Sequence, residues 1–196
     1  MKNRRLAFIL PLLLAACATT TDAGDDDGAP QDGPARTEDR GDGSFVTVLD
    51  ASSESEWTHF DLESGEHVEM SDAAWDLGAL RFNIKTNGGT SGDGGAAVAV
   101  LDGTSFDAVT AAPTDGYRED AAGDPGVGGE MADITPGYAF DEWFAYNPVD
   151  HTLAPAPGRI YVVRTPEGNH YKVEMQGYYD DAGTPGFVSF RWAEIP

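Results

Sequence analysis

The chain has 196 residues, which is enough for one domain with a tail and for a sizeable buried core. Its 34 acidic and 12 basic residues give a net charge of −22, so nucleic acid and anionic membrane surfaces are disfavoured as partners. The single cysteine excludes an intramolecular disulfide.

Residues 1–16 are predicted to be a lipoprotein signal peptide. They combine a basic start, MKNRR, with an apolar run, LAFILPLLLAA, that is shorter than the roughly 20 residues needed to span a bilayer. The run ends in Leu14-Ala15-Ala16-Cys17, which resembles a bacterial lipobox. This resemblance implies cleavage before Cys17 and attachment of acyl chains such as palmitate to the cysteine. The alternative is an ordinary signal peptide followed by a chance cysteine.

Residues 17–43 are predicted to form a disordered acidic linker behind the acylated cysteine. From residue 18 onward they contain no large apolar side chain and are rich in Gly, Pro, Asp and Thr. Such a segment cannot bury enough surface to offset the entropy lost on ordering. The folded domain is therefore expected to span residues 44–196.

Strand patterns dominate that domain. Residues 44–52 are rich in β-branched side chains, and residues 56–70 suggest two strands about the turn Glu63-Ser64-Gly65. A further hairpin is expected between residues 159–164 and 170–176, and a last strand over 186–195. No long segment has a helical period. The predicted class is all-β, mostly antiparallel and sandwich-like.

The stretch Trp75–Val100 contains two apolar runs separated by Asn87-Gly88-Gly89 and further glycines. Asn and Gly tolerate the positive φ of turns, so two strands joined by a long turn are expected. The loop lacks the Lys-Ser/Thr of a phosphate-binding P-loop, and an architectural role is favoured. The chain also lacks a G-x-S-x-G elbow, an H-E-x-x-H motif and a thiolate metal site, so it is not predicted to be an enzyme.

Histidine and methionine are the usual axial ligands of haem iron. Among four histidines, His67 and His170 lie on polar strand faces, His59 is ambiguous, and His151 follows an aromatic segment. Met131, in a long Gly-rich connection, is the best-placed methionine. Three rings of the aromatic segment are candidates to stack on a planar ligand or, alternatively, to fill the core: Tyr138, Trp143 and Tyr146.

Several segments together resemble the HmuY-like family of bacterial haem-binding lipoproteins. They are IKTNGGTSG, EWTHFDLESGE, PTDGY, EWFAYNPVDHTLAP and RIYVVRTPEGNHYKVEMQGYYD. The resemblance implies an HmuY-like β fold and an extracytoplasmic, lipid-anchored protein, with the outer membrane as the expected site. It also implies haem held by two axial side chains and passed to an outer-membrane receptor in iron uptake.

This sequence departs from the family pattern at the ligand positions. Family histidines lie before and just after the aromatic segment, but here the connection from Tyr117 to Pro136 has only Met131 as a ligand-type residue. The position after Tyr146 corresponds most closely to Asn147, with His151 further on. A Met131/His151 pair is therefore the candidate ligand set, with no metal expected beyond haem iron.

Two other functions remain open. The first is a lipoprotein that keeps the fold but has lost haem ligation, and that acts as a structural or partner-recognition module. The second is a calcium-binding surface protein, which only the acidity of the chain suggests.

Overall fold

The computed structural model describes residues 33–71, 73–123 and 137–196. Its elements are β1 (Ala35–Asp39), β2 (Phe45–Asp50), β3 (Thr58–Asp61), β4 (Glu66–Val68), β5 (Leu77–Leu80), β6 (Asn83–Thr86), β7 (Ala97–Asp102), the 3₁₀ turn η1 (Phe106–Ala108), β8 (Phe144–Asn147), β9 (Thr152–Pro155), β10 (Arg159–Arg164), β11 (His170–Tyr179) and β12 (Pro185–Ile195). No helix in these three ranges is long and apolar enough to cross a bilayer.

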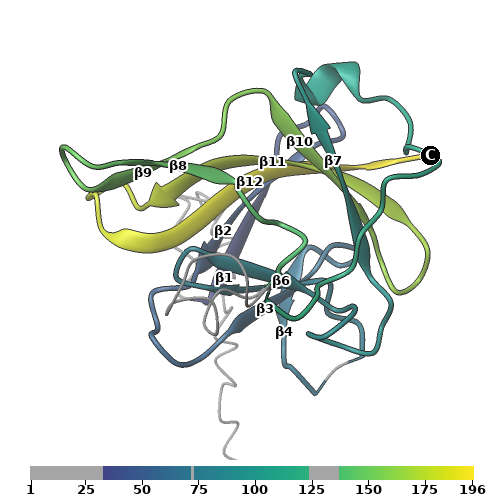
Figure 1. Ribbon diagram of the computed structural model, residues 1–196, viewed down its shortest axis with the longest axis horizontal. Coiled ribbons are helices and arrows are strands. Elements are labelled where there is room, and N and C mark those ends of the chain that lie inside the picture. Colours follow the sequence, from purple (N-terminus) through teal and green to yellow (C-terminus); the bar gives the residue numbers. More distant parts are fainter. Residues whose placement is uncertain (1–32, 72, 124–136) are drawn as a thin grey trace, which may run out of the picture. The chain divides into compact units, whose positions relative to one another are not determined.

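The strands form three antiparallel sheets (Figure 1). A six-stranded sheet has the order β1-β2-β12-β11-β10-β7, a four-stranded sheet has the order β4-β3-β5-β6, and β8 pairs with β9. The predicted all-β, mostly antiparallel fold is confirmed. Both predicted hairpins are present, since β3 pairs with β4 around Gly65 and β10 pairs with β11 around Gly168.

One hydrophobic core joins the two larger sheets. Phe60 of β3 is fully buried, and its ring lies 5.7 Å from that of Phe190 and 6.0 Å from that of Trp192, both on β12. The sequence alternation placed Val188, Phe190 and Trp192 on one face of the last strand, and all three are buried. A smaller apolar cluster lies on the other face of the six-stranded sheet, where η1 packs against it through Phe106.

The sheet begins earlier than predicted. Ala35–Asp39 lies inside the segment expected to be disordered, but it forms β1 and pairs with β2 at five positions. The linker prediction is therefore wrong for these residues, and the folded part starts before Ser44. An edge strand is held by its backbone bonds to one neighbour and often carries charged side chains, so ARTED forms a strand without an apolar run.

The stretch Trp75–Val100 also differs from its prediction, because it forms three strands. β5 and β6 are joined by a turn at Arg81-Phe82, where Arg81 has φ 53°. β6 and β7 belong to different sheets, so the glycine-rich loop carries the chain between sheets and is not a hairpin turn. A Cβ on Gly88 would lie 2.0 Å from the Ala96 oxygen, which explains why this crossing needs glycine.

Candidate functional site

The aromatic segment divides into buried and exposed parts. Trp143 is 2% exposed, and its Nε1 donates a hydrogen bond of 2.8 Å to the Phe82 oxygen. Tyr138 is half-buried and meets the ring of Trp57 edge-on at 5.8 Å. Tyr146 is 53% exposed. The three rings predicted to stack on one ligand therefore do not form one platform, and only Tyr146 lines the cavity described next.

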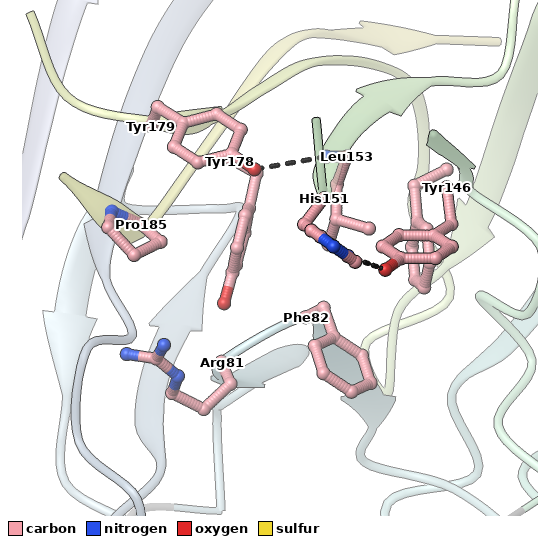
Figure 2. Close-up of a pocket in the computed structure, with 9 residues that line it drawn as sticks. Arg81, Phe82, Tyr146, His151, Leu153, Tyr178, Tyr179 and Pro185 are labelled. Atoms are coloured by element: carbon pink, nitrogen blue, oxygen red, sulfur yellow. Dashed lines mark hydrogen bonds between the residues drawn. The ribbon is translucent and has the colours of Figure 1, made fainter. Parts of the chain in front are cut away.

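The β8–β9 hairpin covers one side of a cavity of about 510 Å³. The turn between β5 and β6 and the ends of β11 and β12 supply its other walls (Figure 2). The lining residues are mostly aromatic or aliphatic: Arg81, Phe82, Phe144, Tyr146, His151, Leu153, Tyr178, Tyr179 and Pro185. A cavity of this size and lining suits a small organic ligand with a large apolar face.

Backbone and ring contacts hold the hairpin over the cavity. The Leu153 N–H donates a hydrogen bond of 3.0 Å to the Tyr179 hydroxyl, which ties β9 to β11. The rings of Phe82 and Phe144 meet at 5.5 Å, which ties β8 to the β5–β6 turn. The cavity therefore depends on three segments that are far apart in the sequence.

His151 is the lining residue of this cavity that carries an imidazole ring. It ends the β8–β9 turn with φ 58°, and its Nδ1 forms a hydrogen bond with the Tyr146 hydroxyl (Figure 2). When Nδ1–H donates to the tyrosine oxygen, Nε2 carries the free lone pair that a metal ligand needs. The Tyr146 bond therefore orients the ring of the strongest ligand candidate in the described cavity wall.

Arg81 adds a positive charge to the same space. Figure 2 shows it at the lower left, with Phe82 to its right and the ring of Tyr178 above it. Its Nη1 donates a hydrogen bond of 3.0 Å to the Ser52 oxygen, which fixes the guanidinium. Guanidinium groups pair with carboxylates, so the cavity can receive a ligand that is apolar, carries a metal and bears an acid group.

The residues predicted for the site are only partly brought together. His151 and Tyr146 share the cavity, Trp143 and Tyr138 lie outside its lining, and Met131 and Cys17 lie outside the described residues.

The sequence analysis missed several lining residues, among them Arg81, Phe82, Tyr178 and Pro185. No local motif marks them, because each lies at the end of a strand that was predicted without its tertiary neighbours. The Tyr178-Tyr179 pair was the one available hint, and the structure brings both rings to this cavity, 5.2 Å apart.

The model of the HmuY protein family matches residues 53–192, which is most of the chain. No relative among curated protein sequences matches significantly.

Several solved structures of bacterial proteins have a similar fold. The apo HmuY analogue of Tannerella forsythia shares 20% identity, with 83% of this chain and 97% of that chain covered and a TM-score of 0.58. A candidate HmuY-like haem-binding protein from Bacteroides vulgatus shares 22% identity, with 80% and 94% covered and a TM-score of 0.55. A candidate lipoprotein from Bacteroides fragilis shares 17% identity, with 80% and 91% covered and a TM-score of 0.58. These likenesses agree with the family match in fold, and the chain belongs to the HmuY protein family.

Proposed function

We propose that this protein is an extracytoplasmic, lipid-anchored haem-binding protein that serves iron uptake and is not an enzyme. The observation that carries the proposal is the aromatic cavity under the β8–β9 hairpin, with His151 and Arg81 in its wall. The names of the related HmuY analogues support the same ligand class.

Several lining residues have chemistry suited to haem. His151 would supply an imidazole nitrogen for the iron, and Tyr146 holds the imidazole ring through its hydroxyl. Arg81 is the partner proposed for a propionate, and Phe82 and Phe144 are the apolar contacts for the porphyrin edge. Met131 is proposed as a second ligand that would hold the iron. When bound, haem supplies an iron centre, while the chain's own residues orient it and exclude water.

The anchor is proposed to be acylated Cys17, which would hold the protein at the outer membrane, facing either the periplasm or the surface. Two or three acyl chains bind a membrane firmly, where one chain binds only marginally. Converting Cys17→Ser should release the protein from the membrane fraction, as measured by fractionation and immunoblotting. Retention of the variant in the membrane fraction would count against the lipobox.

A second function has one observation in its favour. Phe82, Tyr146 and Val149 are 45%, 53% and 88% exposed and all lie on or beside the hairpin. Exposed apolar side chains of this kind mark surfaces that bind proteins. An outer-membrane haem receptor is one partner they fit, and recognition of a partner without haem is the alternative.

Hemin titration separates the two functions. The mature chain carrying Cys17→Ser should shift the Soret band in a saturable way at micromolar protein. His151→Ala should weaken binding at least tenfold and change the spectrum, whereas Tyr146→Phe should weaken it by about tenfold because it removes only the bond that orients the ring. Met131→Ala should change the spectrum if the second ligand is correct.

His67→Ala is the matched control, because His67 lies on β4 and does not line the cavity. Its titration should match that of the unchanged protein. A chain that gives no saturable Soret shift would rule out haem and leave the partner-recognition function. Equal losses in the His67 and His151 variants would point to binding outside this cavity.

A further inference from the structure

Three carboxylates meet where β3 ends and β5 begins. Asp61 is the last residue of β3, Glu63 lies in the turn to β4, and Asp76 directly precedes β5. One carboxylate oxygen from each residue lies within 4.8 Å of the others. None of these residues lines the cavity under the β8–β9 hairpin.

Asp76 is the unusual member of this acidic cluster. It is fully buried, and its Oδ2 accepts a hydrogen bond of 2.7 Å from the Leu62 N–H. Its Oδ1 is also buried and has no hydrogen-bond partner among the described residues. A buried carboxylate oxygen without a partner costs several kcal/mol. An occupant of the space between the carboxylates would therefore lower the free-energy cost of burying Asp76.

The nearby charges add to this cost. Glu63 and Asp61 both act on Asp76 with the same sign of charge. None of the ion pairs found in residues 33–71, 73–123 and 137–196 includes Asp61, Glu63 or Asp76. The cluster thus gathers negative charge without a basic side chain to balance it.

The other two carboxylates are held in place by neutral donors. Glu63 Oε1 accepts hydrogen bonds from Thr165 Oγ1 at 2.7 Å and Asn169 Nδ2 at 3.1 Å, both from the β10–β11 turn. Asp61 Oδ2 accepts one from Ser64 Oγ at 2.9 Å. A carboxylate oxygen has two lone pairs, so Asp61 Oδ2 can accept its bond and still ligate a cation. Glu63 accepts both of its bonds at Oε1, which leaves its second oxygen, Oε2, as the ligand atom.

We propose that Asp61, Glu63 and Asp76 bind a calcium ion. The ligand set contains only oxygen, which selects a hard cation over zinc or copper. Calcium accepts 6–8 oxygen ligands in flexible geometry, whereas magnesium needs a near-ideal octahedron. Beside the cluster lies a cavity of about 350 Å³ lined in part by Glu63, Ser64 and Glu194, which leaves room for water ligands.

A shared proton is the competing occupant. Burial raises the pKa of Asp76 to about 9, opposed by the bond from the Leu62 N–H and reinforced by the charge of Glu63. A protonated Asp76 would ease the repulsion without any metal. The experiment must therefore separate a bound ion from a retained proton.

The purified full chain, stripped with a chelator, is titrated with CaCl₂ at pH 7.5 by calorimetry, and its thermal unfolding is followed. We expect saturable binding at one site, with a Kd on the order of 10⁻⁴ to 10⁻³ M, and a rise in Tm of a few degrees that MgCl₂ does not reproduce. Asp76→Asn and Glu63→Gln should each abolish both effects. Glu63→Gln provides the readout if the Asp76 variant does not fold, because Glu63 is exposed.

Asp93→Asn is the matched control, because it removes one acidic group outside the cluster and should leave the calcium response unchanged. A missing calcium response in the unchanged chain would overturn the proposal in favour of the proton. An equal response to MgCl₂, or a response that persists in both cluster variants, would overturn it in favour of general screening of the acidic surface. Neither result depends on hemin, so the haem proposal is tested separately.

Discussion

His59 was ambiguous in the sequence, and the structure places it in the interior of the four-stranded sheet. Its side chain is 4% exposed, its ring meets that of Trp75 edge-on at 4.8 Å, and its Nε2 has no partner in the described part of the chain. Burial lowers the pKa of His59 to about 4, and the nearby Lys85 charge acts in the same direction. His59 is therefore a neutral core residue, and it lies outside the lining of the cavity under the β8–β9 hairpin.

This burial makes stability depend on pH in a definite direction. Between pH 6.5 and about 4 the folded state binds fewer protons at His59 than the unfolded state does. The contribution of His59 to the free energy of unfolding is complete above pH 6.5 and is lost as the pH falls through about 4. This contribution amounts to roughly 3 kcal/mol.

His59→Phe should flatten the fall of unfolding free energy between pH 6.5 and 4, as measured by urea denaturation at several pH values. Ile84→Val is the control, because it alters packing in the same sheet without changing a titratable group. The control should keep the original slope. Identical slopes in the His59 variant and the unchanged protein would show that the histidine does not titrate differently on folding.

Among the strands, β1 has the clearest experimental consequence. Besides pairing with β2, it supplies Thr37, whose hydroxyl donates a hydrogen bond of 2.8 Å to the Gly65 oxygen in the β3–β4 turn. The Asp50 N–H also donates to the Pro34 oxygen at 2.8 Å. A fragment that starts at Ser44 loses all of these bonds and leaves β2 as an unpaired edge.

We expect residues 44–196 to melt roughly 5–10 °C below residues 32–196, corresponding to a loss of about 2–3 kcal/mol. The shorter fragment should also self-associate, because an uncovered edge strand is a template for pairing. Differential scanning calorimetry and light scattering measure the two effects. Equal melting temperatures and equal sizes would mean that β1 does not contribute to the fold.

The turns between strands could be predicted from the sequence, whereas the pairing of some strands could not. The turns at Gly65 and Gly168 were predicted because glycine chemistry acts over a few residues. Similar Asn-Gly signals at residues 87–89 suggested a hairpin, but the loop changes sheets. The choice of partner strand depends on distant residues, such as Asp120, whose Oδ2 accepts a hydrogen bond of 2.8 Å from the Thr86 N–H.

The candidate site followed the same pattern. Tyr146 was identified because it lies in a short aromatic segment, and His151 because it follows that segment. Arg81 and Tyr178 come from segments far from it in sequence, and nothing local connects them. The sequence therefore predicted two residues that line one cavity wall, while tertiary packing determined the rest of the lining.

For the folded part as a whole, the shared core makes the two larger sheets one cooperative unit. Phe60 contributes a fully buried ring from the smaller sheet to aromatic neighbours on the larger one. We expect tryptophan fluorescence and far-ultraviolet circular dichroism to report the same denaturation midpoint. Two separated midpoints would contradict a common core.

Phe60→Ala should lower the unfolding free energy by about 3–5 kcal/mol, because it leaves a cavity between the sheets. Both spectroscopic signals should shift together to lower denaturant. Phe82→Ala is the control, since its ring is 45% exposed and should cost much less. A shift confined to one signal would indicate that the sheets unfold separately.

The position of β1 would also limit the distance between the folded part and a membrane that holds Cys17. If Cys17 is the anchor, the connection to the sheet consists of residues 18–34, and not of residues 18–43. A chain spans at most about 3.3–3.6 Å per residue, so the maximum reach falls from about 90 Å to about 60 Å. If a membrane-bound partner collects a ligand from this protein, the two must meet within this shorter reach of the bilayer.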